Sequence, residues 1–409
     1  MAALHQTAVA PVRTDVRRSA GVSVVLRTIL DHGPIARSTI ARRTGLSAAA
    51  VSRHCAELTD RRLVRELPSR TPLSNVGRPH VPVDLDLDRH AVGGIHIAVP
   101  HTTVALVDLR GRVIAEQVLP HTDRDPARVL DRACGGLATL LATDGAGRIP
   151  LGIGLATGGW VNRETGDIVV HDQLGWSDVP AGRILTERWG LPTAVENHSR
   201  ALARAELLFG AAREQARESL VHLFVGNMVD AALSTAGGLQ QGPRSAAGEI
   251  AHLPVGDPDV RCDCGGRGCF QATVSDRAMA ERAAAAGVTA RVSFDDLVAA
   301  ARDGVPGAVA LFRQRARGVG RLVAMLLDLV NPEVLVVAEG GLILLPELRS
   351  RLLADLHEEV RDRSRTCRDP EATVLPSSFG SAVLGVAAGS TMLDEMYAHP
   401  LHTPTIRNT

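Results

Sequence analysis

The chain has 409 residues, 45% of them hydrophobic, which suits two or three domains of roughly 100–200 residues each. Positive and negative charges balance at neutral pH, and no apolar run reaches the ~20 residues that a helical membrane span needs. The first 20 residues also lack an apolar stretch long enough for a secretory signal. Composition therefore excludes a helical membrane protein and favours a cytoplasmic, globular one.

The two ends of the chain differ in charge. Residues 1–80 contain 13 arginines and five acidic residues, a balance of +8, so residues 81–409 carry −8. A basic N-terminal part on an acidic remainder indicates a polyanionic partner, such as DNA, at that end only. A solvated charged surface would give the same balance, so charge alone leaves both interpretations open.

Three helices are predicted in the basic part. Over residues 21–32 apolar side chains recur at helical spacing and form one stripe, made of Val22, Val25, Leu26, Ile29 and Leu30. Gly33-Pro34 ends this helix, and a short second helix follows over residues 36–43. A turn at residues 44–46 leads to a third helix, which Ser47 caps and which runs to about residue 60. Its buried positions are expected to be Val51, Cys55 and Leu58.

Two helices joined by a three-residue turn are typical of a helix-turn-helix. The segments 63–67 and 81–86 read as two strands around a tip rich in Pro, Ser and Gly, which would form a wing. The third helix would lie in the major groove and the tip arginine in the minor groove. The candidate DNA-contacting residues are Arg37, Ser47, Ala49, Ser52, Arg53 and Arg78. A helical module of the same shape that docks on protein is the alternative.

Alternating strands and helices begin near residue 91. The segments 92–99, 102–109 and 112–119 predict a three-stranded meander, followed by a helix over 126–143 and a strand over 150–157. The alternation continues to about residue 400, so this part of the chain is expected to be α/β.

One cluster of residues has the composition of a metal site. His252, Cys262, Cys264 and Cys269 offer one imidazole and three thiolates within 18 residues, the tetrahedral ligand set of structural zinc. Four protein ligands leave no open position for a substrate, so the metal would be structural. Reduced cysteines in a flexible loop are the alternative. The remaining three cysteines lie apart in sequence and are expected to be ordinary buried thiols.

Three segments of the second part carry a specific resemblance, namely residues 174–210, 247–270 and 331–341. Together with TGLSAAAVSRHCAEL and GRP in the first part, they resemble the ROK family of repressors, uncharacterised reading frames and sugar kinases. The resemblance implies an α/β protein with a winged helix-turn-helix at residues 1–86 and an actin-like, two-lobed sugar-kinase fold. The lobes would span residues 87–196 and 197–409, with the last helix packed back on the first lobe.

The resemblance also assigns the residues that a kinase would need. The family's general base is the aspartate of a Glu-Asn-Asp run, which here reads Glu196-Asn197-His198. The first phosphate loop of the family has the pattern Gly-x-Asp-x-Gly-x-Thr, in which His96 replaces the aspartate and Ala98 the second glycine. Such loops hold phosphate with closely approaching glycine backbone and free N–H groups, so these changes are expected to weaken nucleotide binding.

The other nucleotide-binding segments are altered as well. The second phosphate loop carries Met228 where a glycine is expected and Asp230 where a nucleotide phosphate would lie. Glu339 stands directly before Gly340 and Gly341 of the adenosine segment. Phosphoryl transfer depends on positioning and charge stabilisation. Changes to the base and to both phosphate loops therefore predict that the chain is not an enzyme.

By the same resemblance a sugar would be read by Asn197, His198, Glu249, His252 and Gln271. His198 and Gln271 each replace a carboxylate, which accepts paired hydrogen bonds from neighbouring hydroxyls better than either substitute. Three interpretations of the pocket stay open: an ordinary neutral sugar, a modified or acidic sugar, or a pocket kept only for structure. His252 would serve both the sugar and the zinc.

These observations predict a DNA-binding transcriptional regulator, a repressor that binds a pseudo-palindromic operator as a homodimer or a dimer of dimers. Its partners would be double-stranded DNA and a sugar effector. The alternatives are an ATP-dependent sugar kinase with an accessory DNA-binding domain and a module that docks on protein. A coupled ATPase assay tests the first alternative, and the salt dependence of binding tests the second.

Overall fold

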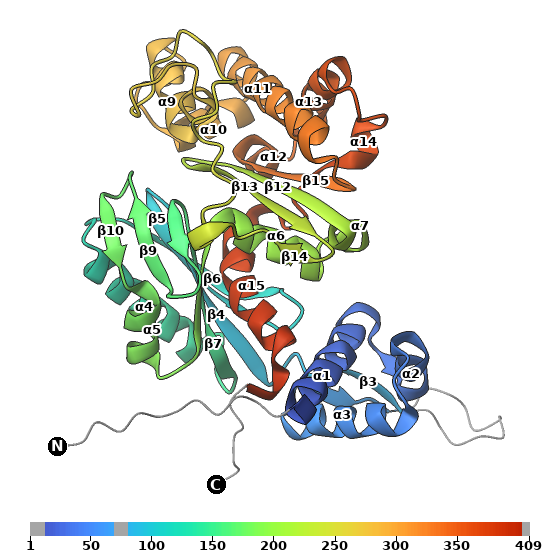
Figure 1. Cartoon of the computed structure of the whole chain (residues 1–409). Coiled ribbons are helices and arrows are strands. Elements are labelled where there is room, and N and C mark those ends of the chain that lie inside the picture. The colour runs from blue at the N-terminus through green and yellow to red at the C-terminus, as the bar shows by residue number, and fades with distance from the viewer. Residues whose placement is uncertain (1–12, 69–80, 403–409) are drawn as a thin grey trace.

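The computed structural model describes residues 13–68 and 81–402. A small N-terminal head lies beside a larger body of two α/β lobes, and the final helix α15 (Val383–Ala398) extends from between the lobes towards the head (Figure 1). No helix within the described ranges is both long and apolar enough to cross a membrane.

The head is a three-helix unit with a small antiparallel sheet. Its helices are α1 (Arg13–His32), α2 (Arg37–Thr44) and α3 (Ala48–Asp60). Its strands, in their order across the sheet, are β1 (Ile35–Ala36), β3 (Pro82–Leu85) and β2 (Val64–Glu66). All three predicted helices are present, and the predicted buried positions of α3 have no exposed area. The sequence did not predict β1, because two residues are too few to show an alternating pattern.

Lobe 1 is built on a five-stranded sheet in the order β11-β7-β4-β5-β6. The predicted meander is present as antiparallel β4, β5 and β6, and β7 and β11 join it in parallel. The strands are β4 (His90–Ile97), β5 (His101–Val107), β6 (Val113–Pro120), β7 (Ile149–Thr157) and β11 (Thr193–Asn197). A smaller antiparallel sheet follows β7 and consists of β8 (Trp160–Asn162), β9 (Asp167–His171) and β10 (Trp176–Val179).

Helices cover both faces of the lobe 1 sheet. Apolar side chains of α4 (Pro126–Ala142) and α5 (Ala181–Trp189) pack on one face, and α15 packs on the other. Gly154 on β7 allows α15 to come close, because a Cβ atom there would lie 1.9 Å from the carbonyl oxygen of Ala388. The absence of a side chain at this position therefore sets the distance between the last helix and the sheet.

Lobe 2 has a second five-stranded sheet in the order β14-β13-β12-β15-β16. The strands are β12 (Ser219–Val225), β13 (Val229–Thr235), β14 (Gly238–Leu239), β15 (Val334–Glu339) and β16 (Val374–Pro376). The helices of this lobe are α6 (His198–Phe209), α7 (Arg213–Glu218), α8 (Phe270–Val274), α9 (Asp276–Ala285), α10 (Phe294–Arg302), α11 (Pro306–Val330), α12 (Gly340–Leu344), α13 (Arg349–Arg363) and α14 (Pro370–Thr373). The largest apolar cluster among the described residues lies between this sheet and α8 to α13.

Two helices fill the space between the two large sheets. α6 packs on β12 and β13 of lobe 2 and against α15, which packs on the lobe 1 sheet (Figure 1). Ala201 and Leu202 of α6 share one buried cluster with Ala387 and Ala388 of α15. The first residues of α6 therefore lie at the junction of the lobes, directly after strand β11 of lobe 1.

The head shares its apolar core with the body. Leu26 and Ile29 of α1 belong to the same buried cluster as Met396 and Tyr397 of α15. Polar contacts reinforce this packing, since the Ser23 hydroxyl donates to the carbonyl oxygen of Tyr397 at 2.6 Å. The head is thus held to the end of α15 by a continuous, buried interface.

Candidate functional site

Helix α3 presents the predicted recognition face to solvent. Ser47 is its N-cap, and the Ser47 Oγ accepts a hydrogen bond from the backbone N–H of Ala50 at 3.2 Å. Ser47, Ala49, Ser52 and Arg53 are all exposed, whereas the opposite side of the helix is buried in the head. These four side chains are therefore available for contacts in a DNA groove.

The other two arginines of the predicted DNA-contacting set differ from Arg53. Arg37 is half-buried at the start of α2 and forms an ion pair with Glu66 of β2, so it would have to leave this carboxylate to reach a phosphate. Arg78 lies outside the described residues. Arg42 and Arg43, which the sequence reasoning passed over, are exposed in the last turn of α2, next to the helix-turn-helix turn.

The four predicted metal ligands come together at one point. Their ligand atoms all lie within 4.8 Å of one another. Cys262 Sγ is 3.5 Å from His252 Nδ1, and Cys264 Sγ is 3.6 Å from Cys269 Sγ. Ligand atoms around a tetrahedral zinc, with bonds of about 2.0–2.3 Å, are separated by about 3.5–3.8 Å. The cluster therefore has the donor types and the spacing of a four-coordinate metal site.

The loop around this cluster needs its glycines. Gly265 has φ = 90° and Gly268 has φ = 69°, a backbone region that only glycine enters without strain. The backbone N–H of Cys262 donates to the carbonyl oxygen of Gly266 at 2.9 Å and closes the loop. Of the cysteines outside the cluster, Cys55 and Cys134 are buried as predicted, whereas Cys367 is only half-buried.

A group of buried histidines occupies the junction of the lobes. His198, the first residue of α6, places its Nε2 2.7 Å from Asp230 Oδ2 of β13. His96 of β4 stacks almost parallel on the His198 ring, with ring centroids 5.9 Å apart. Burial lowers the pKa of His96 well below its ordinary value, and the charge of His198 adds to this effect. His96 and His198, which replace two aspartates of the kinases, thus form one cluster with Asp230.

The other predicted sugar-reading residues already have partners within the protein. Asn197 caps α6, with its Oδ1 accepting from the Ser199 N–H at 2.9 Å and its Nδ2 donating to the Gly159 carbonyl oxygen at 3.0 Å. Gln271 Oε1 accepts from the backbone N–H of Val229 at 3.0 Å. These bonds use both polar atoms of the Asn197 side chain and one of the two polar atoms of Gln271.

Glu249 lies beside the histidine cluster. Its Oε1 accepts from the Ala251 N–H at 3.0 Å. Burial raises the pKa of the Glu249 carboxyl, and the negative charge of Asp230 raises it further, while His252 lowers it. Glu249 therefore lies within the electrostatic reach of both Asp230 and the metal ligand His252. The structure brings the predicted sugar residues into one region at the junction of the lobes. This region, together with His96 and Asp230, is called the interlobe site.

His171 is a buried histidine of this region that sequence reasoning missed. Its Nδ1 accepts a hydrogen bond from the Leu174 N–H at 3.3 Å, so the neutral ring carries its proton on Nε2. That Nε2 and both ring nitrogens of His96 are buried and have no hydrogen-bond partner among the described residues. Buried polar groups are nearly always paired, so these three nitrogens are the hydrogen-bonding atoms that this region has to offer.

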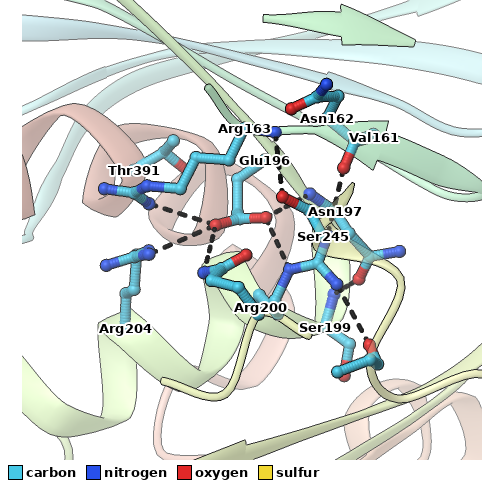
Figure 2. A network of polar contacts seen from close by, with 12 residues as sticks. Val161, Asn162, Arg163, Glu196, Asn197, Ser199, Arg200, Arg204, Ser245 and Thr391 are labelled. Atoms are coloured by element: carbon cyan, nitrogen blue, oxygen red, sulfur yellow. Dashed lines mark hydrogen bonds and ion pairs between the residues drawn. The ribbon is translucent and has the colours of Figure 1, made fainter. Parts of the chain in front are cut away.

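Glu196 lies at the centre of a charged network next to this site (Figure 2). Its carboxylate has no exposed area and contacts Arg200 at 2.7 Å, Arg163 at 3.1 Å and Arg204 at 3.2 Å. Burial raises the pKa of Glu196, but the three guanidinium groups hold it below its ordinary value. Arg204 also pairs with Asp394 near the end of α15. The network therefore joins the start of α6 to the last helix.

Comparison with known proteins accounts for both parts of the chain. The ROK family profile matches residues 92–388, and the MarR family profile matches residues 19–72. The chain belongs to the ROK family. Its two-lobed body shares the fold of ROK sugar kinases of known structure, and its head is a MarR-like winged helix domain.

This ROK protein is similar to named regulators over nearly its whole length. It is 33% identical to the transcriptional regulator Rv0485 of Mycobacterium tuberculosis, over 92% of this chain and 86% of that protein. It is 27% identical to the N-acetylglucosamine repressor of Escherichia coli O157:H7, over 82% and 85% of the two chains. A crystal structure of a ROK family transcriptional regulator, a homologue of the E. coli MLC protein, superposes with a TM-score of 0.72 at 24% identity and covers 94% of this chain and 100% of that chain.

In this ROK protein Glu339, the last residue of β15, caps the helix that follows it. Both carboxylate oxygens of Glu339 accept backbone N–H groups at the start of α12, at 2.9 and 3.0 Å. The buried guanidinium of Arg315 pairs with Glu339 at 3.0 Å and with Asp276 at 2.8 Å. It also lies over the ring of Phe294, 5.3 Å from the centroid. The N–H groups at the start of α12 are therefore already paired with the Glu339 carboxylate.

Proposed function

We propose that this ROK protein is a DNA-binding transcriptional regulator that acts in the cytoplasm as a repressor. The observation that carries the proposal is the winged helix-turn-helix head, which presents Ser47, Ala49, Ser52 and Arg53 to solvent from one helix. The +8 balance of residues 1–80 supports a DNA partner over a protein partner. The similarity to regulators along nearly the whole chain points the same way.

Replacing Arg53 with alanine tests this assignment. Loss of one arginine contact to a base edge costs about 1–3 kcal/mol and relaxes the choice of base at one position. We therefore expect the Arg53→Ala variant to bind DNA from the region upstream of its own gene about 5- to 150-fold more weakly. Arg183→Ala, which removes an exposed arginine from α5 of the body, is the matched control and should bind as the unmodified protein does.

The salt dependence of the same titration separates DNA from protein as the partner. Each phosphate contact releases counterions, so the logarithm of the binding constant falls steeply and linearly with the logarithm of salt concentration. Unchanged binding by Arg53→Ala, together with a flat salt dependence, would overturn the recognition-helix assignment.

We further propose that the protein works as a homodimer or a dimer of dimers. One wing-and-helix unit reads only a few base pairs, and a dimer doubles this by binding two half-sites about one helical turn apart. We expect a footprinting experiment to show two protected half-sites arranged as a pseudo-palindrome, and protection of a single half-site would contradict a dimer.

The Cys₃His cluster is assigned to structural zinc. Its support is the donor set and the spacing of the ligand atoms, at 3.5 and 3.6 Å for two of the pairs. Cys262, Cys264, Cys269 and His252 would hold the ion, and four protein ligands would leave no position for a substrate. Because the loop lies within a few residues of Glu249, the metal would also orient one wall of the interlobe site.

We propose that the interlobe site binds the effector, a sugar or a sugar derivative. His198 and Gln271 replace carboxylates, while Asp230 and Glu249 supply the remaining acidic groups of the site. The unpaired ring nitrogens of His96 and His171 support a polar ligand there. A neutral imidazole nitrogen donates or accepts one hydrogen bond, which suits the hydroxyl groups of a sugar or of a modified sugar.

We propose that the protein has no kinase activity. In the adenosine segment, Glu339 accepts the backbone N–H groups of Gly341 and Leu342 and pairs with Arg315. In the second phosphate loop, Met228 packs against Gly158 across the lobes, 2.7 Å from where a Cβ would stand. One observation favours the kinase alternative, because the His198–Asp230 pair has the geometry of an oriented general base. A coupled ATPase assay across a panel of hexoses decides, and sugar-dependent ADP release would establish the kinase.

We also propose the route by which the interlobe site controls the head. Glu196 adjoins Asn197 and contacts Arg204, which pairs with Asp394 of α15. Asp394 also contacts Arg27 of α1 in the head at 3.4 Å. A shift of α6 on ligand binding would therefore move Arg204 relative to Asp394. The ion pair of Asp394 with Arg204 in the body would weaken or strengthen relative to its ion pair with Arg27 in the head. Head orientation, and with it the spacing of two recognition helices in a dimer, would follow.

A further inference from the structure

A cavity of about 510 Å³ lies between residues 254–258, α8, α9 and α11, apart from the histidines of the interlobe site. Its volume is in the range of sites that bind small molecules. Three arginines line it, Arg282, Arg315 and Arg321, while Asp257 is the acidic residue among its lining side chains. The cavity is therefore a predominantly cationic space, and neither the DNA-binding head nor the sugar site accounts for it.

Arg282 in this cavity is a cation with no acidic partner. Its guanidinium donates to two backbone carbonyl oxygens, those of Thr273 at 2.7 Å and Ala278 at 3.3 Å, and within the described part of the chain it forms no ion pair. Burial lowers the pKa of Arg282, and the nearby charge of Arg315 lowers it further, while Asp257 opposes this. Such a half-buried charge is stabilised by an anion.

The other two arginines differ in whether their charge is neutralised within the protein. Arg315 has no exposed side-chain area, and its guanidinium is close to two carboxylates, with Nε 3.0 Å from Glu339 and Nη2 2.8 Å from Asp276. Arg321, half-buried on the same face of α11, has no ion pair or hydrogen bond from its side chain in the described ranges. Arg282 and Arg321 thus offer two guanidinium groups without acidic partners to the same space.

We propose that this cavity binds a phosphorylated small molecule, with its phosphate between Arg282 and Arg321. A phosphate monoester carries a charge of about −1.5 to −2 at neutral pH. Arg282 and Arg321 supply two positive charges to balance it, and Asp257 offsets part of them. Guanidinium also binds phosphate with two parallel hydrogen bonds. Val255 and Val274 supply apolar surface for the organic part. The same wall carries residues 254–258, between the metal ligands His252 and Cys262, so an occupied cavity would brace the metal loop.

Calorimetric titration of the full chain, without DNA, tests this proposal. Glycerol 3-phosphate is the probe, glycerol is its uncharged match, and inorganic phosphate tests the anion alone. We expect binding of glycerol 3-phosphate and no binding of glycerol. Arg321→Ala and Arg282→Gln should each weaken binding about tenfold or more, the loss expected for a charged hydrogen bond. Arg321→Ala removes no hydrogen bond or ion pair within the described residues, so its unfolding temperature should change little.

Arg277→Ala is the matched control, because Arg277 lies on α9 like Arg282 but is exposed and pairs with Glu281. It should bind glycerol 3-phosphate normally. Absence of binding by the unmodified protein, or undiminished binding by the Arg282→Gln/Arg321→Ala double variant, would overturn the proposal. Because no DNA is present, this outcome is independent of whether the head binds an operator.

Discussion

At the scale of single residues, His171 is a buried imidazole that stays neutral in the folded protein. Burial and the charge of His198 lower its pKa to about 4, from 6.5 for an ordinary histidine. Below pH 6.5 the unfolded chain takes up a proton that the folded chain does not. The free energy of unfolding therefore falls as pH decreases, by about 1.4 kcal/mol per pH unit for this residue, until the pH reaches about 4. We expect His171→Asn, whose Oδ1 still accepts from Leu174, to remove this share of the pH dependence.

Urea unfolding of the two proteins between about pH 7 and pH 4 measures the difference in slope. His32→Asn, at an exposed position at the end of α1, is the control and should leave the slope unchanged. Equal slopes in all three proteins would contradict the assignment of His171 as a neutral, buried group.

At the scale of elements, the metal loop should depend on its ion for local order. Most of its backbone hydrogen bonds join residues of the loop to one another rather than to the strands of lobe 2. A metal present at 1,000 times its dissociation constant stabilises the folded form by about 4 kcal/mol. We expect one zinc per chain by elemental analysis. Chelation should increase amide hydrogen exchange in residues 252–270 more than elsewhere in lobe 2. Cys264→Ser should lose the zinc, and Cys367→Ser, outside the cluster, should keep it.

At the scale of the whole molecule, the ion pairs from Glu196 to Arg27 should make the interlobe site and the head interdependent. A double-mutant cycle on operator affinity combines His198→Asn in the site with Arg27→Ala in the head. We expect a coupling free energy above about 0.5 kcal/mol, the limit for independent distant sites. Arg18→Ala is the control, because Arg18 lies on the same helix but pairs with Glu57 inside the head. Additive effects in the Arg27 cycle would show that the two sites are not coupled through this route.

Local patterns in the sequence predicted the parts of this protein that depend on neighbouring residues. The helices of the head follow from apolar spacing, because α-helix periodicity is a property of short segments. The metal cluster follows from four ligand residues within 18 positions, since a short loop cannot separate them widely. The resemblance of three segments to the ROK family predicted the two-lobed α/β body.

Only the tertiary structure decided which distant residues meet. His96, His198 and Asp230 come from β4, α6 and β13, and the order of strands in two separate sheets brings them together at the junction of the lobes. The sequence identified His96 and His198 as the residues that replace two aspartates of the kinases. It did not indicate that their rings stack on each other. For the same reason, the sequence did not predict that Glu196 and Arg315 are buried ion-paired residues. A buried charge needs oppositely charged partners, and long-range packing determines which residues these are.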